Sequence, residues 1–301
     1  MIKKTLYFGN PAYLKKELGQ LKIEYPEDID KPHRQVPIED VGLVILDHPR
    51  LTITQSLLSA LIEQNAAVLS CNEKHMPQGL VMPMSANHAY TEKLRYQLNA
   101  TEPLRKNLWQ QTVKAKIANQ IRLLEKLEAH TQNMHYWLRQ VKSGDPDNYE
   151  GRAAAYYWKT LFNSEVDFKR RRFGEPPNNL LNYGYAVLRA IVARNLVSSG
   201  MLPAVGIHHR NKYNPFCLAD DIMEPYRPYV DELVLEIIEN YDDDELEELT
   251  TKIKAEILVL PTLDVYIDEV SSPLMVAMGR TTASLMQCFE GIKRRIAYPT
   301  L

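Results

Sequence analysis

The sequence predicts an α+β fold, with a small β-rich N-terminal domain over residues 1–85 and a larger all-α C-terminal domain over residues 86–301. Short apolar runs bounded by proline and glycine are confined to the first part. Long segments with apolar residues at helical spacing fill the second part. A chain of 301 residues with 45% apolar residues can also bury a sizeable core.

Three short runs in the first part predict strands: residues 41–48 (VGLVILDH), 66–71 (AAVLSC) and 80–83 (LVMP). Between the first two, residues 52–65 carry apolar side chains at helical spacing and predict a helix with Thr52 as its N-cap. Earlier in the chain, prolines predict turns at positions 11, 26, 32 and 37.

The helical part begins with a long amphipathic segment at residues 101–130, opened by Thr101 and by Pro103 in the first turn. Further helices are predicted over residues 151–162, 181–200, 228–241, 244–260 and 272–295.

Charge and cysteine content exclude several classes of protein. The net charge of −2 argues against a small basic DNA-binding domain, yet the cationic runs 169–172 and 293–295 can still form a basic face. The three cysteines are far apart, so they form neither a disulfide framework nor a zinc ribbon. No apolar run has the length of a signal peptide or a membrane span, so we expect a cytoplasmic protein that does not enter a membrane.

The segment at residues 206–228 (GIHHRNKYNPFCLADDIMEPYRP) concentrates potential metal ligands. Gly206 and Pro215 exclude a regular helix across the two histidines. Asp220 and Asp221 then introduce a helix, on which Glu224 shares a face with either aspartate.

A loop histidine just upstream can reach that face. Carboxylate oxygens suit Mg²⁺ and Mn²⁺, and Mn²⁺ also accepts imidazole. The alternative is that the acids only cap a helix and complement its dipole.

Two further candidates lie upstream. Glu150 precedes Gly151 at the start of an alanine-rich helix, where a carboxylate also gains from the helix dipole. The basic run at 169–172 lies in a loop beside Phe168, and cations near aromatic rings suit phosphate backbones. Each of these features alone is more often structural or solvated than functional.

Other chemistries lack their sequence patterns. The chain contains no phosphate-binding P-loop, no dinucleotide-binding GxGxxG after a strand, no GxSxG nucleophile elbow and no HExxH zinc motif. The remaining histidines have no ligand spacing and are expected to be structural.

Four motifs occur in one order along the chain: LWQQTVKAKIANQ (108–120), NYEGRAAAYYW (148–158), LNYGYAVLRA (181–190) and the long segment at 206–228. In this combination the chain resembles the integrase subunit of CRISPR adaptation, the nuclease that installs new spacers, and most closely its type II-like branch. The resemblance covers nearly the whole chain.

The resemblance implies a homodimer whose N-terminal β domain serves dimerisation and partner contact. It also implies a heterohexamer with a small ferredoxin-like adaptation subunit. The complex would hold double-stranded DNA, the prespacer, and join its 3′ ends to the CRISPR repeat with Mg²⁺ or Mn²⁺. The effector nuclease is a further candidate partner.

The resemblance places the metal ligands at Glu150, His209 and Glu224, with Asp221 as a further catalytic carboxylate. His208 is the alternative to His209 as ligand, because this chain has a second histidine at position 208, where the family often has an apolar residue. The candidate DNA-contacting cations are Arg152, Arg170, Arg171, Arg210, Lys212 and Arg227.

Two other functions use the same residues. A structure-specific repair nuclease would need the same site but no partner subunit. A DNA-binding scaffold with a dead site is a different class, and the presence of all the acids and histidines argues against it.

Overall fold

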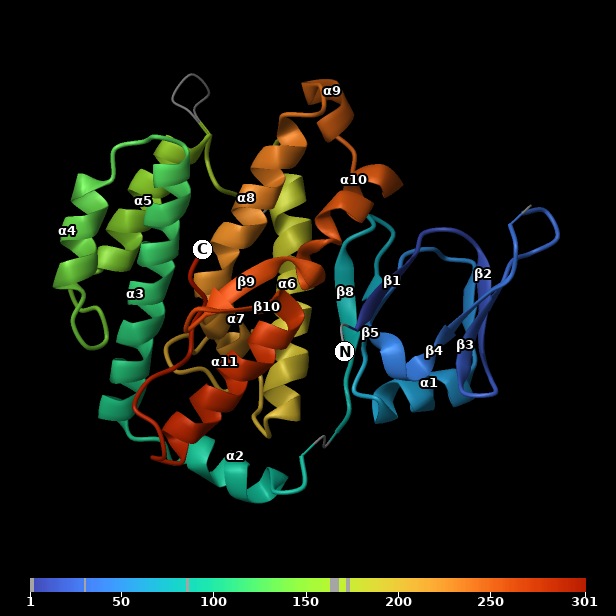
Figure 1. Ribbon diagram of the computed structural model, residues 1–301, viewed down its shortest axis with the longest axis horizontal. Helices are drawn as coiled ribbons and strands as arrows, with labels where there is room; N and C mark the ends of the chain where they lie inside the picture. Colours follow the sequence, from blue (N-terminus) through green and yellow to red (C-terminus); the bar gives the residue numbers. More distant parts are fainter. Residues whose placement is uncertain (1–2, 30, 85–86, 163–167, 172–173) are drawn as a thin grey trace.

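The computed structural model describes residues 3–29, 31–84, 87–162, 168–171 and 174–301. Figure 1 shows the strands of the N-terminal part at one end of an elongated molecule and the helices of the C-terminal part at the other. The predicted α+β class is therefore confirmed.

The first sheet has the order β1 (Lys4–Phe8), β5 (Val41–Leu46), β7 (Ala67–Cys71) and β8 (Pro77–Val81). Its first three strands are parallel, and β8 runs antiparallel to β7. β5 and β7 coincide with two predicted strands, whereas β8 begins at Pro77 and shares only residues 80 and 81 with the strand predicted over 80–83. β1 was not predicted.

The second sheet was not predicted. Its order is β4 (Arg34–Pro37), β3 (Gln20–Glu24), β2 (Ala12–Glu17) and β6 (Leu51–Ile53), with β6 parallel to β2. A short 3-10 helix, η1 (Ile38–Asp40), leads into β5.

Helix α1 (Gln55–Glu63) begins later than predicted, with Thr54 at the N-cap position in place of Thr52. The physical reason is strand pairing. Thr52 pairs with Tyr13 of β2, so the residues before Thr54 extend the second sheet and are not available to the helix.

The first sheet separates two hydrophobic clusters. Val44 and Val68 pack with α1 and the second sheet. Leu43, Ile45 and Leu69, which alternate with them, pack with the helices. Because successive side chains of a strand point to opposite faces, one sheet serves both cores. The predicted domain boundary at residues 85–86 lies outside the described residues.

The helical part begins with α2 (Tyr90–Leu98), α3 (Glu102–Lys126), α4 (Gln132–Gln140), α5 (Tyr149–Leu161) and α6 (Asn178–Ser198). Thr101 caps α3 as predicted, accepting a hydrogen bond from the backbone N–H of Leu104 at 3.4 Å. The separate helices α2 and α4 were not predicted.

The chain continues through α7 (Cys217–Met223), the 3-10 turn η2 (Glu224–Tyr226), α8 (Arg227–Ile238), α9 (Asp243–Leu246), α10 (Thr251–Ile257), the 3-10 turn η3 (Leu260–Thr262), β9 (Asp264–Ile267), β10 (Val270–Pro273) and α11 (Leu274–Phe289). The predicted helix over 244–260 is thus split, because Thr250 caps a new helix by accepting from the N–H of Ile253 at 3.3 Å. The hairpin β9–β10 also shows that the C-terminal part is not wholly helical.

Helix α6 is the centre of this part. It is buried along most of its length and packs against α7, α8 and α11, and its contacts reach β7 and β8. Helix α3 contacts α4 and α5, which follow it in sequence, and also α7 and η2, so it brings two distant parts of the chain to one place. Among the described residues, no helix combines the length and apolarity needed to cross a membrane.

Candidate active site

Two glutamates from different helices converge on one lysine. Lys116, on α3, places its Nζ 2.7 Å from Oε1 of Glu150 and 2.6 Å from Oε2 of Glu224. All three side chains are largely buried, with 11%, 23% and 6% of their surface exposed. The arrangement therefore holds two carboxylates around a single positive charge.

The first turn of α5 fixes the position of Glu150. The carboxylate of Asp145 accepts the backbone N–H of Tyr149 at 3.0 Å and that of Glu150 at 2.9 Å. Asn148 accepts the N–H of Gly151 at 3.1 Å from a left-handed backbone conformation that asparagine tolerates. These caps satisfy the free N–H groups of the helix start and orient Glu150 toward α3.

Glu224 lies in η2, at the junction of α7 and α8. Its Oε1 lies 2.9 Å from Nε of Arg227 in an ion pair, and the carbonyl of the following Pro225 accepts a hydrogen bond from Nδ2 of Asn119 at 2.8 Å. Burial alone would raise the pKa of Glu224, but Arg227 and Lys116 more than offset this and lower it. Glu224 is therefore held as a carboxylate in the interior.

Lys116 was not singled out from the sequence. Burial alone would lower its pKa, yet Glu224 and Glu150 outweigh burial and raise it, so the ammonium is retained. A signal was present, because Lys116 lies four residues from each of Thr112 and Gln120 on the buried stripe of α3. A lysine on an otherwise inward-facing stripe needs a buried partner.

Asp221 organises the loop that carries the two histidines. Its fully buried carboxylate accepts the backbone N–H groups of Ile207, His208 and His209 at 2.7, 3.0 and 3.2 Å. The same group bonds to Nδ1 of His209 at 2.6 Å. In this structure Asp221 is thus a positioning residue that acts on the site through His209.

Gly206 permits this loop to approach α7. A Cβ at residue 206 would lie 2.8 Å from Oδ2 of Asp221 and would also collide with the carbonyl of His209. Any larger residue would push the histidines away from Asp221, so a glycine is needed here.

The two histidines are distinguished by their neighbours. His208 stacks on Trp109 of α3 with ring centroids 4.1 Å apart and planes 3° apart. The hydrogen bond with Asp221 raises the pKa of His209, while desolvation lowers the pKa of His208. Because Nδ1 of His209 is bonded to Asp221, its Nε2 is left as the donor atom for a ligand.

Asp220 does not join the other acids. Helix α7 begins at Cys217, earlier than the predicted start at Asp220. Asp220 pairs with Nε of Arg189 at 2.6 Å and accepts from Asn214 at 2.7 Å. The predicted sharing of one face by Asp220 and Glu224 is therefore not observed, because Arg189 of α6 draws Asp220 away.

Within the part of the chain that the structure describes, no group of three or more His, Cys, Asp and Glu side chains is arranged to hold a metal ion. The donor chemistry nevertheless fits a hard divalent cation. Glu150 and Glu224 direct oxygens at one point, and a cation, the ammonium of Lys116, lies there. The ammonium stands in for the positive charge that such an ion would bring.

The cations proposed from the sequence to contact DNA divide into two groups. Arg227 is tied to Glu224, and Arg170 donates to Asn178 and Asn182 at 3.0 and 2.7 Å, so both are held by the protein. Arg172 of the basic run lies outside the described residues. The remaining candidates are exposed at the surface: Arg152, Arg171, Arg210 and Lys212.

A buried carboxylate, Asp231, holds tyrosines that pack beside the candidate site. Asp231 on α8 accepts hydrogen bonds from the hydroxyls of Tyr157, at 2.7 Å, and Tyr185. The ring of Tyr185 in turn lies 4.6 Å from the guanidinium of Arg227 and 5.2 Å from that of Arg170. Burial raises the pKa of Asp231 from 3.8 to about 6.

Asp231→Asn is expected to change how stability depends on pH. The carboxyl of Asp231 binds its proton more tightly in the folded state than in the unfolded state. The stability that this proton contributes is therefore fully present below pH 3.8 and is lost as the pH rises through about 6. The free energy of unfolding of the variant, relative to wild type, should therefore rise by on the order of 3 kcal/mol between acidic and neutral pH. Urea unfolding at several pH values measures this, with Asp264→Asn at an exposed position of β9 as the baseline. A difference that is independent of pH would contradict the prediction.

Comparison with known proteins gives a family and a fold. A family model described as CRISPR associated protein Cas1 matches residues 6–247. A CRISPR-associated endonuclease Cas1 of Neisseria meningitidis serogroup C (strain 8013) is 38% identical over 287 residues, which cover 94% of this chain and 91% of the relative.

Two solved structures share the fold. A casposase bound to an integration product has a TM-score of 0.80 at 20% identity, over 99% of this chain and 93% of the other. A Cas6-RT-Cas1–Cas2 complex has a TM-score of 0.76 at 21% identity, over 99% of this chain and 36% of the other.

Proposed function

The chain belongs to the Cas1 family of CRISPR-associated proteins, and on this premise we propose that it is a metal-dependent DNA endonuclease and integrase that inserts short DNA fragments into a CRISPR array. The observation that carries the proposal is the convergence of Glu150 and Glu224 on one cationic position, close enough to His209 for both charges to help raise its pKa. Carboxylates held around a cation suit phosphodiester chemistry, in which a bound metal ion can activate the nucleophile and stabilise the charge on the phosphate.

Glu150, Glu224 and Nε2 of His209 would hold Mg²⁺ or Mn²⁺. When bound, such an ion lowers the pKa of an attacking hydroxyl and neutralises the charge that develops on the phosphate. Asp221 fixes the orientation of His209, and Arg227 fixes that of Glu224. The protein thus supplies ligands whose positions are set before the DNA arrives.

A cationic side chain beside the proposed metal ligands can interact with the reacting phosphate of the DNA. The ammonium of Lys116 balances both carboxylates while no ion is bound, and an ion at that point would free it to pair with an anionic phosphate oxygen. Attack by a DNA 3′-hydroxyl forms one P–O bond and breaks another, which joins two strands. Attack by water at the same phosphate cuts the strand, so one site supports both integration and cleavage.

The partners follow from the same premise. We expect a homodimer, double-stranded DNA as prespacer and repeat, and a small ferredoxin-like adaptation subunit in a heterohexamer. The solved complex that names Cas1 together with Cas2 supports such a partner subunit. The N-terminal sheets are the proposed surface for dimerisation and partner contact.

An integration assay tests the function. The purified chain, with and without the partner subunit, is given a short duplex with 3′-hydroxyl ends and a supercoiled plasmid that carries the repeat. Joining is expected in Mg²⁺ or Mn²⁺ and is expected to be lost in EDTA. Cleavage without joining, even with the partner, would favour a repair nuclease, and no reaction in any metal would favour a scaffold.

His209→Ala is expected to abolish joining and cleavage and to weaken Mn²⁺ binding, measured by electron paramagnetic resonance of the titrated ion. Loss of a ligand or its orienting partner typically lowers affinity or activity by about 10–100-fold. His208→Ala is the matched control, because His208 stacks on Trp109 and is not bonded to Asp221 through its ring. The opposite ranking of the two variants would make His208 the ligand.

A further inference from the structure

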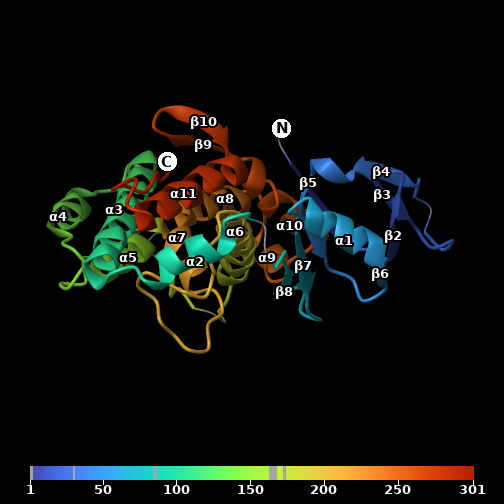
Figure 2. The ribbon, with the colours of Figure 1, turned by 90° about the horizontal axis from the view of Figure 1, so that it is seen from below.

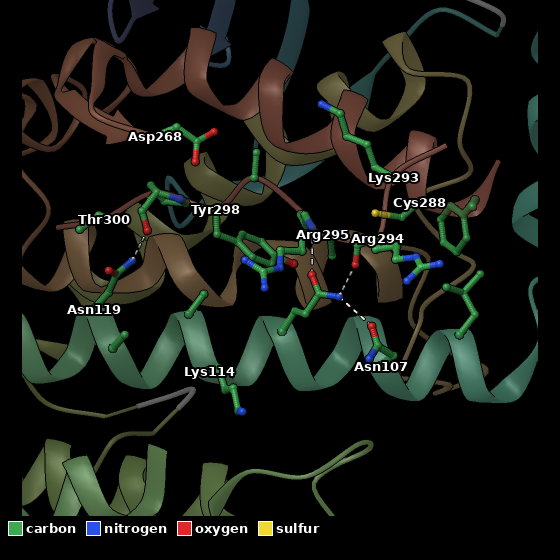
Figure 3. Close-up of a pocket in the computed structure, with 18 of the residues that line it drawn as sticks. Asn107, Lys114, Asn119, Asp268, Cys288, Lys293, Arg294, Arg295, Tyr298 and Thr300 are labelled. Atoms are coloured by element: carbon green, nitrogen blue, oxygen red, sulfur yellow. Dashed lines mark hydrogen bonds between the residues drawn. The ribbon is translucent and has the colours of Figure 1, made fainter. Parts of the chain in front are cut away.

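A groove runs between α3 and the C-terminal segment that follows α11, residues 291–300. It has a volume of about 890 Å³ and is lined by residues of α3, the end of α11 and the C-terminal segment. Figure 3 shows α3 along one side and the C-terminal segment along the other. The groove contains none of the residues of the candidate active site.

Arginines dominate the charge of this groove. Arg122 comes from α3, and Arg294 and Arg295 come from the C-terminal segment, where their side chains are exposed. Across the described parts of the chain, none of the three has an acidic partner within 4.0 Å. The acid that lines the groove, Asp268, lies 4.0 Å from Arg280, so its charge is offset elsewhere.

The lysines of the lining contribute less. Figure 3 shows the side chains of Lys114 and Lys293 pointing away from the space between α3 and the C-terminal segment. In the same view, Arg294 and Arg295 extend into the region between α3 and the C-terminal segment. The positive charge that faces the groove is therefore carried mainly by guanidinium groups, which bind phosphate oxygens in pairs.

The C-terminal segment is held in a defined position. Gln111 of α3 donates to the carbonyl of Arg294 at 3.0 Å and accepts from the N–H of Ile296 at 2.9 Å. Ala297 bonds through its backbone to Ser284 at 2.8 Å and to Thr281 at 2.6 Å. The backbone beneath the arginines is thus fixed before any ligand binds, which lowers the entropy cost of binding.

The groove and the candidate active site use different faces of one helix. Lys116 points toward Glu150, whereas Gln111 and Arg122 lie well round the helix from it and face the C-terminal segment. Figure 2 shows the loop before α7 on one side of the molecule and the C-terminal segment on the other. Asn119 joins the two places, since its Nδ2 donates to the carbonyls of Pro225 and Pro299 at 2.8 and 3.0 Å.

We infer that this groove binds the sugar–phosphate backbone of double-stranded DNA, at a segment away from the reacting phosphate. The inference rests on the proposed function. An integration reaction brings two DNA segments to one protein, and the carboxylate site accommodates only the phosphate that reacts. Arginines that have no acidic partner among the described residues and that lie on a fixed backbone can hold DNA by charge without reading its bases.

The test uses the full chain with Arg294→Gln and Arg295→Gln together. These changes leave the backbone bonds of the segment in place, because the bonds that Gln111 makes to this segment go to its main-chain atoms. The Kd for a fluorescent duplex is measured by anisotropy over a range of salt concentrations. We expect binding to weaken by about tenfold or more, and the slope of log Kd against log salt to fall by up to about 2.

The matched control is Lys16→Gln with Arg34→Gln, which removes two exposed cations from β2 and β4. It separates a local effect from a change in net charge, and it should leave the slope unchanged. Unchanged Kd and slope in the groove variant would overturn the inference. Loss of partner-subunit binding with unaltered DNA binding would also overturn it and would assign the groove to an acidic protein surface.

Failure of this inference is distinguishable from failure of the proposed function. With a saturating short oligonucleotide, the groove variant should cleave at the wild-type rate, because its changes are remote from Glu150 and Glu224. Glu150→Gln should show the reverse pattern, with the wild-type salt slope and no cleavage. Cleavage lost in the groove variant at saturation would mean that the arginines act on the chemistry and not on DNA binding.

Discussion

Glu150→Gln is expected to lower both strand joining and strand cleavage by at least about 100-fold, while the chain stays folded. A metal-ion site contributes several kcal/mol of transition-state stabilisation, and each 1.36 kcal/mol corresponds to about tenfold in rate. Glutamine keeps the shape of the side chain and can still accept a hydrogen bond from Lys116. What it loses is the negative charge that the proposed ion requires.

The effect on stability should be small, because Lys116 keeps its second partner, Glu224, 2.6 Å from its Nζ. Glu150 lies in the first turn of α5, where an acid contributes about 0.3–1 kcal/mol through the helix dipole. The caps from Asp145 and Asn148 stay in place, because they bind backbone N–H groups. Thermal unfolding and the joining assay on the same preparation therefore separate a loss of chemistry from a loss of fold.

Glu102→Gln is the matched control for Glu150→Gln. Glu102 also opens a helix, α3, and also pairs with a lysine, Lys106 at 2.8 Å, but this pair is exposed. An exposed pair contributes about 0–1 kcal/mol, so neither stability nor activity should change measurably. If Glu150→Gln kept full activity, the assignment of the site to these carboxylates would be wrong.

The fold could be predicted from the sequence where periodicity is strong and local. Strands β5 and β7 are almost continuously apolar, and α3 opens on a threonine cap followed by a proline. The second sheet was missed because its turns lack the usual signals. Leu18 and Gly19 both adopt positive φ values, 48° and 76°, between β2 and β3, and leucine is not a residue from which such a turn is predicted.

The hairpin β9–β10 was missed for the same reason. Its turn is formed by Asp268 and Glu269, with φ values of 49° and 62°, and glutamate rarely marks a left-handed turn. The apolar residues around it also continue the helical spacing of the neighbouring segments. Tertiary packing against α11 decides the outcome, and a local pattern does not contain that information.

The sequence predicted which residues belong to the candidate site better than it predicted the contacts between them. The resemblance singled out Glu150, His209, Asp221 and Glu224, and the structure brings Glu150 and Glu224 to one cation. The role of Lys116 depends on contacts 34 and 108 residues away in sequence, which spacing cannot reveal. Likewise, nothing in the sequence indicates that Asp221 binds three backbone N–H groups of the histidine loop.

A second large effect is expected where the N-terminal sheet meets the helices. Asp47, directly after β5, is nearly fully buried and accepts hydrogen bonds from Tyr7 at 2.7 Å and Lys254 at 2.7 Å, with His75 at 2.9 Å. Lys254 lies on α10, and its side chain is 3% exposed. Burial alone would raise the pKa of Asp47, but its hydrogen-bond partners, led by Lys254, lower it.

Lys254→Met is expected to reduce the free energy of unfolding by about 3–5 kcal/mol, because it leaves a carboxylate buried without its cation. The free energy of unfolding of a folded domain is only about 5–15 kcal/mol in total, so the shift in the urea midpoint should be large. The loss should appear first as weakened protection from hydrogen exchange in β1 and β5, since Tyr7 lies in β1 and Asp47 directly follows β5.

A second change should reverse much of this loss. In Asp47→Asn with Lys254→Met, both charges are removed and an asparagine can still bond to Tyr7 and His75, so the double variant should be more stable than Lys254→Met alone. Lys252→Met, at an exposed position of the same helix, should shift stability by no more than about 0.5 kcal/mol. If the double variant were as unstable as Lys254→Met, the loss would come from the contacts of the ammonium with the rings of Tyr7 and Tyr183, whose centroids lie 5.9 Å from Nζ, and not from the unpaired carboxylate.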